Sequence, residues 1–169
     1  MSRHTLSVLV ENKPGVLTRF TGLIARRGFN IHSLAVGTTE REELSRITVV
    51  VDVGSVALEQ VTKQLNKLVN VIKIVELEPE ASVRRAHMIF KVRADAAARP
   101  QIASAVEMFR GHIVDVGPST ICVEATGERS KLDALRQVLE PFGIKEIVQS
   151  GTVAIGRGSK SMTDRAPRV

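Results

Sequence analysis

The hydrophobic positions in the first half of the chain change period in a regular order. Residues 4–11, "HTLSVLVE", and residues 45–53, "SRITVVVDV", alternate and are rich in β-branched side chains, which is typical of strands. Residues 16–27 carry apolar side chains at 3.6-residue spacing, which predicts an amphipathic helix that ends at Gly28. The remaining predicted elements of this half are strands at 29–39 and 71–78 and a helix at 55–68.

The order of these elements is βαββαβ, the split arrangement of ferredoxin-like folds. The same order returns later, with strands at 86–94, 111–118, 120–127 and 144–151 and helices at 98–109 and 129–142. The sequence therefore predicts an α+β protein of two ferredoxin-like βαββαβ modules, 1–78 and 85–156, joined by a linker at 79–84. Residues 157–169 lack apolar periodicity and are expected to form a disordered basic tail.

Net charge adds little to this interpretation. The chain has a formal charge of +6, and residues 157–169 contribute +3 of it, so the folded part is only mildly basic. The chain has five Phe, no Trp and no Tyr, which leaves few aromatic platforms for stacking nucleic-acid bases. A basic terminal tail is more often solubilising than DNA-binding, and we expect no nucleic-acid partner.

Cysteine usage and hydropathy indicate the compartment. Cys122 is the single cysteine, so no intramolecular disulfide can form, and its apolar neighbours favour a buried core position over a reactive thiol. No apolar stretch approaches the roughly 18 residues of a membrane span, and the N-terminus lacks the apolar region of a signal peptide. We expect a cytoplasmic protein without a membrane partner.

Motifs that carry catalytic chemistry are missing from the sequence. There is no phosphate-binding glycine loop, no H-E-x-x-H and no paired C-x-x-C. The histidines occur singly in or next to predicted strands, without the close spacing of metal ligands, at His4, His32, His87 and His112. We therefore expect no catalytic residues, no metal site and no active site in this chain.

The segment "NKPG", residues 12–15, joins the first strand to the first helix. The first N–H groups of a helix lack intrahelical acceptors, and the helix dipole there stabilises a carboxylate by about 0.3–1 kcal/mol, up to ~2 when partly buried. Gly15 lets a ligand approach the backbone, and Asn12 offers a donor and an acceptor to a zwitterion. Asn30 could reach the same region from a neighbouring subunit. The alternative interpretation is a turn and helix cap without a ligand.

Longer stretches around this loop resemble a known family. They include "ENKPGVLTR", "RRGFNIHSL", "LSRITVVV", "QLNKLVNVIKI", "FRGHIVDVGPSTICVEATG", "KLDAL" and "EIVQSGTVAIGRG". Together they resemble the amino-acid-binding ACT domain and, more narrowly, the small regulatory subunit of acetohydroxyacid synthase, also called acetolactate synthase. The resemblance covers residues 3–158 and leaves the basic tail outside.

This resemblance implies a non-catalytic protein with one main partner. Members of the family bind the catalytic large subunit, raise its activity and make it sensitive to feedback inhibition by valine in branched-chain amino-acid biosynthesis. The cofactors that the resemblance implies, thiamine diphosphate, Mg²⁺ and FAD, belong to the large subunit, and none is expected in this chain. Partial cross-reaction with leucine or isoleucine is expected, since one methylene changes affinity by only ~1–3 kcal/mol.

The resemblance also implies where the effector binds. The family's site lies between two ACT domains that pair side by side in a homodimer. Carried over to this sequence, it takes Asn12, Gly15, Val16 and Leu17 from one chain and Asn30 and Ile31 from its partner. The alternative from another class is a free-standing ACT-type amino-acid sensor that acts on transcription. The linker at 79–84 is interpreted either as a hinge that relays effector binding or as a simple flexible joint.

Overall fold

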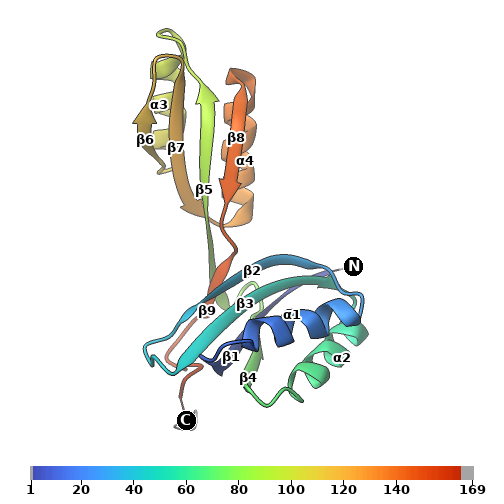
Figure 1. Ribbon diagram of the computed structural model, residues 1–169. Helices are drawn as coiled ribbons and strands as arrows, with labels where there is room; N and C mark the ends of the chain where they lie inside the picture. Colours follow the sequence, from blue (N-terminus) through green and yellow to red (C-terminus); the bar gives the residue numbers. More distant parts are fainter. Residues whose placement is uncertain (1, 165–169) are drawn as a thin grey trace. The chain divides into compact units, whose positions relative to one another are not determined.

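The computed structural model describes residues 2–164, with the side chains of residues 2, 55 and 56 left aside. It divides into two compact units (Figure 1). The first takes the chain up to Val83 together with the residues from Thr152 onward, and the second takes Arg84–Gly151. The chain therefore passes from one unit to the other twice.

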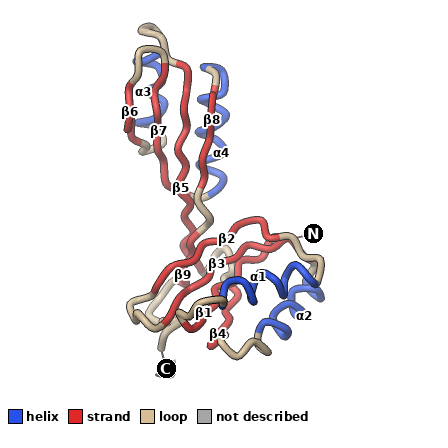
Figure 2. Tube along the Cα trace, in the orientation of Figure 1, coloured by secondary structure: helices blue, strands red, loops and turns tan. Residues whose placement is uncertain are grey.

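The first unit is a four-stranded antiparallel sheet covered by two helices on one face (Figures 1 and 2). Its elements are β1 (Ser2–Glu11), α1 (Val16–Arg26), β2 (Ile31–Thr38), β3 (Leu44–Val53), α2 (Ser55–Leu65) and β4 (Val71–Glu76). The strand order is β2-β3-β1-β4, which leaves β2 and β4 at the edges. The central pair β1 and β3 stays in register from Ser2 opposite Val53 to Glu11 opposite Leu44.

Alternation along β1 decides which side chains face the helices. Leu6, Val8 and Val10 point to the core under α1 and α2, where they pack with the fully buried Phe20 and Ile24. The intervening residues of β1 face the opposite side of the sheet. Helix α1 ends as the sequence predicts, because Gly28 adopts a φ of 72° that few other residues tolerate.

The second unit repeats this construction. Its elements are β5 (Ser82–Arg93), α3 (Ala98–Met108), β6 (His112–Val116), β7 (Thr120–Gly127), α4 (Arg129–Leu139), a 3₁₀ turn (Glu140–Phe142) and β8 (Ile144–Gln149). The strand order β6-β7-β5-β8 matches that of the first unit. A separate core centres on Phe90, Ile102 and Leu135, all fully buried. The predicted α+β fold of two βαββαβ modules is confirmed.

The boundaries differ from those expected for the modules. Strand β5 begins at Ser82, so the second half of the expected 79–84 linker is strand. A ninth strand, β9 (Val153–Gly156), pairs with β5 and belongs with the first unit instead of ending the second module. Four residues with exposed Val153 and Ile155 carry too little periodicity to reveal a strand whose partner lies some seventy residues earlier.

Two smaller expectations also change. Residues 157–164, expected to be disordered, pack on the first unit, where Arg157 donates its backbone N–H to the Ala81 carbonyl at 2.8 Å. The remainder of the expected tail, 165–169, lies outside the described residues. Cys122 is half-buried and outside the core cluster, because it faces the side of its sheet away from the helices, opposite Lys91 and Asp115.

Candidate functional site

The loop between β1 and α1 ends in a glycine with an unusual backbone conformation. Gly15 is the N-cap of α1, with φ 82° and ψ −7°, in the left-handed region. A Cβ atom built on Gly15 would meet no atom within 4 Å, so the space beside this glycine is open. The first turn of α1 contains no acidic side chain. The start of the helix is therefore accessible to an anion.

The backbone amides at this helix start lack acceptors. Arg19 donates its N–H to the Gly15 carbonyl at 3.1 Å, the first regular helical bond, and Val16 reaches the Lys13 carbonyl at 3.4 Å. Within residues 2–164, Leu17 and Thr18 donate their N–H groups to no backbone carbonyl, and no side chain caps them. These two donors and the positive end of the helix dipole suit a carboxylate.

Asn12 holds this loop in place. Its side-chain Nδ2 donates to the Glu42 carbonyl at 2.9 Å, and its backbone N–H donates to the Glu43 carbonyl at 2.8 Å. One of the two Nδ2 hydrogens of Asn12 is therefore used within the chain, which leaves one side-chain N–H as the expected donor to a zwitterion. Its Oδ1 accepts no hydrogen bond from the described residues, which leaves an acceptor for an ammonium group.

The carboxylate that directly precedes the loop, Glu11, is paired. Glu11 pairs with Lys13 at 2.6 Å and accepts from the Asn70 Nδ2 at 3.1 Å. The hydrogen bond from Lys13, followed by that from Asn70, lowers the pKa of Glu11 below its usual value. Arg19 donates in turn to the Asn70 Oδ1 at 3.1 Å, so the paired Glu11 carboxylate is linked through Asn70 to α1.

The apolar residues expected in the site differ in exposure. Val16 is 6% exposed and belongs to the core, so it contributes its backbone to the loop surface. Leu17 is 42% exposed and presents its side chain at the surface beside the open glycine. Leu17 is thus the residue of this pair that can contact an aliphatic ligand directly.

Asn30 and Ile31, the remaining residues of the predicted effector site, follow the C-terminal end of α1, whereas Gly15 lies at its N-terminal end. Asn30 is exposed and Ile31 is the half-buried first residue of β2, both following the end of α1 at Arg26. The eleven-residue helix separates them from Gly15 by roughly 16 Å. One chain does not bring the six residues together, so a shared site requires a second copy and stays a prediction.

Other chemistry is not assembled in the described residues. No three His, Cys, Asp or Glu side chains among residues 2–164 lie close enough to hold a metal ion. Over the same residues, every helix is too short or too polar to cross a bilayer.

Comparison with known proteins accounts for both units. Residues 6–73 match the family model described as the AHAS small subunit-like ACT domain, and residues 85–158 match that of the small subunit of acetolactate synthase. The acetolactate synthase small subunit of Mycobacterium bovis is 58% identical over 159 residues, which cover 94% of this chain and 95% of the relative. The chain belongs to the acetolactate synthase small-subunit family.

More distant members of the acetolactate synthase small-subunit family agree. The probable acetolactate synthase small subunit of Methanothermobacter thermautotrophicus is 47% identical over 160 residues, covering 94% of this chain and 95% of that protein. A crystal structure of the small subunit from Thermotoga maritima is 40% identical and superposes with a TM-score of 0.87, covering 95% of this chain and all of that chain. The sequence resemblance stated above is confirmed over both units.

Proposed function

We propose that this chain is the regulatory subunit of an acetolactate synthase and that it docks on a catalytic large subunit and raises its activity. The names of its relatives support this role, and family models of the small subunit account for both units. The chain has no catalytic domain of its own. Thiamine diphosphate, Mg²⁺ and FAD are proposed to belong to the partner, and no residue of this chain is assigned to them.

The effector is proposed to be valine, bound where α1 begins. The observation that carries this proposal is the pair of unpartnered amides at Leu17 and Thr18 beside the open space at Gly15. The valine carboxylate accepts from these amides, the ammonium donates to the Asn12 Oδ1, and the isopropyl group lies on Leu17. Burying such an aliphatic group stabilises the complex by about 1.5–3 kcal/mol.

The second half of the site is proposed to come from another copy. Strand β2 is an edge strand, and within the described residues it pairs with β3 alone. Its Val36 is 47% exposed, an apolar side chain at an unpaired edge. Two chains pairing through β2 in a symmetric homodimer would bring Asn30 and Ile31 of each to the α1 loop of the other.

Relay of the valine signal is proposed to use both chain crossings. The hinge expected at 79–84 is proposed to act together with a second passage, because the chain returns to the first unit between Gly151 and Thr152. A change in the placement of the units on valine binding would have to involve both passages. A coupling free energy of about 1–3 kcal/mol would change activity roughly 5–150-fold.

The test is a valine titration of the complex formed with a catalytic acetolactate synthase large subunit. Gly15→Asp puts a fixed carboxylate in the proposed carboxylate position, so the valine response should vanish while activation survives. Gly15→Asn is the matched control, since Asp and Asn have the same shape, both enter the left-handed region and differ in charge. A fully valine-sensitive Gly15→Asp variant would place the effector site elsewhere.

The mixture with the large subunit also distinguishes a regulatory subunit from the alternative, a sensor that acts on transcription. Deleting residues 158–169 removes three of the four basic residues of the tail, on which such a sensor would rely for DNA. Loss of nucleic-acid binding in that variant would favour the sensor, whereas unchanged activation of the large subunit supports the regulatory subunit.

A further inference from the structure

The helix-free face of the first sheet carries a cavity of about 680 Å³. Its floor comes from β1, the end of β2, β3 and β4, and its roof is the segment 157–164, here called the C-terminal segment. The cavity lies on the face of β1 opposite the core, because Leu9 lines it while Val8 and Val10 belong to the core cluster. Its volume falls within the range of small-molecule sites, roughly 300–1,000 Å³.

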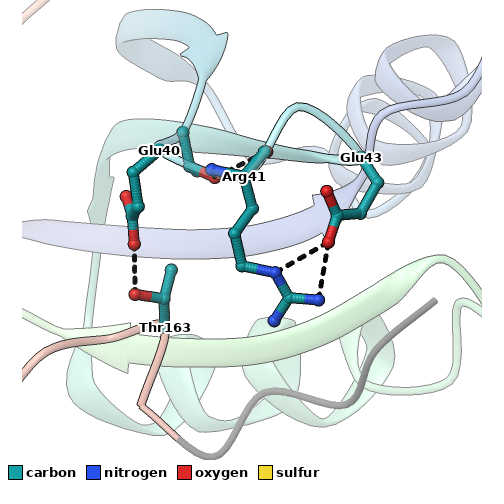
Figure 3. Close-up of polar contacts among 5 residues, drawn as sticks. Glu40, Arg41, Glu43 and Thr163 are labelled. Carbon is teal, nitrogen blue, oxygen red and sulfur yellow. Dashed lines mark hydrogen bonds and ion pairs between the residues drawn. The ribbon is translucent and has the colours of Figure 1, made fainter.

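The C-terminal segment is held over this face by specific contacts. The Thr163 hydroxyl donates to the Glu40 carboxylate, and the two side chains point toward each other beside the Arg41–Glu43 pair (Figure 3). The buried Ser7 hydroxyl donates to the Met162 Sδ at 3.2 Å. Contacts with β1 and with the loop after β2 thus fix the far end of the roof.

A half-buried cation faces this space. Arg46 Nε donates to the Ser7 Oγ at 2.6 Å, and Ser7 is fully buried. Burial lowers the pKa of Arg46, and Glu40 opposes that shift from a distance. Among the described residues no carboxylate lies within 4.0 Å of the guanidinium, and its two Nη atoms donate no hydrogen bond. Such a guanidinium is suited to a bidentate anion.

The rest of the lining matches an anion with an apolar body. Four basic residues line the cavity against one acidic residue: Arg46, Lys73, Arg157 and Lys160 against Glu40. Leu9, Val75 and Leu77 provide an aliphatic floor, with Leu9 and Leu77 buried. We propose that this cavity binds an amphipathic organic acid, with its carboxylate on Arg46 and its aliphatic body on the floor, as a site separate from the start of α1.

The test uses the full chain and the amphipathic anion 8-anilinonaphthalene-1-sulfonate as a fluorescent probe. The chain has no Trp and no Tyr, so probe emission is free of energy transfer from them. The proposal expects saturable binding that decanoate displaces and decan-1-ol does not. Arg46→Met should weaken probe binding tenfold or more. Arg26→Met, which removes an exposed cation from the last turn of α1, is the matched control and should change nothing.

A second variant keeps the proposal falsifiable if Arg46→Met fails to fold. Lys73→Met changes an exposed side chain at the cavity wall and should weaken the probe several-fold. The proposal would be overturned if a folded Arg46→Met variant bound the probe with unchanged affinity. If Arg46→Met does not fold, unchanged affinity in Lys73→Met would overturn it instead. Equal displacement of the probe by decan-1-ol and decanoate would also overturn it. Displacement by valine would place the probe at the α1 site and overturn it too. A chain that ends at Asp164 should bind the probe with the affinity of the full chain. Probe binding that appears only after this truncation would contradict the proposal.

Discussion

The side-chain amide of Asn12 donates a hydrogen bond to the backbone carbonyl oxygen of Glu42, 2.9 Å away. This bond ties the loop before α1 to the turn between β2 and β3, two segments thirty residues apart. Nδ2 thus holds the loop, while Oδ1 accepts no hydrogen bond from the described residues and is available to the proposed ligand. Asn30, the other amide of the proposed site, makes no hydrogen bond with the described residues.

Asn12→Ala should therefore change stability as well as valine binding. Losing an exposed hydrogen bond costs about 0.5–1.5 kcal/mol, with the lower end expected here. The measurement is the free energy of unfolding from urea titration, beside the valine affinity from calorimetry. A variant with wild-type stability would show that the Asn12–Glu42 bond does not hold the loop.

Asn30→Ala, unlike Asn12→Ala, should change valine binding without changing stability. Its side chain is exposed and without a hydrogen bond in the described chain, so the free energy of unfolding should not change. Valine affinity should fall by about 1–3 kcal/mol if the amide binds ligand across the interface. Unchanged equilibrium binding of valine would remove Asn30 from the site.

Pairing through β2 predicts a change of oligomeric state. Val36→Lys places a charge at the exposed edge strand and should convert a dimer to a monomer in analytical ultracentrifugation, with loss of valine binding. Val69→Lys is the control, because it is the same substitution at a site away from β2. Val69 lies in the loop after α2 and is 90% exposed. Dissociation by both variants, or by neither, would contradict an interface at β2.

Acid should break the Glu40–Thr163 contact of the C-terminal segment. The Thr163 hydroxyl lowers the pKa of Glu40 below its ordinary 4.5. A lowered folded pKa means that this contact is fully present above pH 4.5 and is lost as pH falls through the lower folded value. The Thr163 amide signal in NMR should titrate with a midpoint below 4.5, and Glu40→Gln should abolish that titration. A midpoint at or above 4.5 would show that the contact does not favour the ionised form.

The sequence predicts those elements well whose ends and faces are set by neighbouring residues. Helix α1 follows from apolar spacing and from Gly28, whose φ of 72° ends the helix where expected. Residues 152–164 could not be placed, because β9 and the C-terminal segment are ordered by partners far away, such as Ala81 and Glu40. The same reason hides Arg46, whose half-buried state depends on a roof more than a hundred residues later.

The candidate site was predictable only as a set of residues. Asn12 to Leu17 are neighbours in sequence, so their grouping at the helix start needs no tertiary information. The loss of one Asn12 donor to Glu42 could not be foreseen, since it depends on a turn thirty residues away. The proposed meeting of Gly15 with Asn30 would require a second chain, so the distance between them cannot be derived from the pattern of one chain.

Mixing two impaired variants tests the shared site most directly. If each site takes Gly15 from one chain and Asn30 from the other, a dimer of one Gly15→Asp chain and one Asn30→Ala chain has one doubly altered site and one intact site. The two variants are mixed after unfolding and refolding, and valine binding is measured by calorimetry. Random pairing should restore wild-type affinity at about a quarter of all sites. Mixtures that bind no better than the separate variants would contradict a site built from two chains.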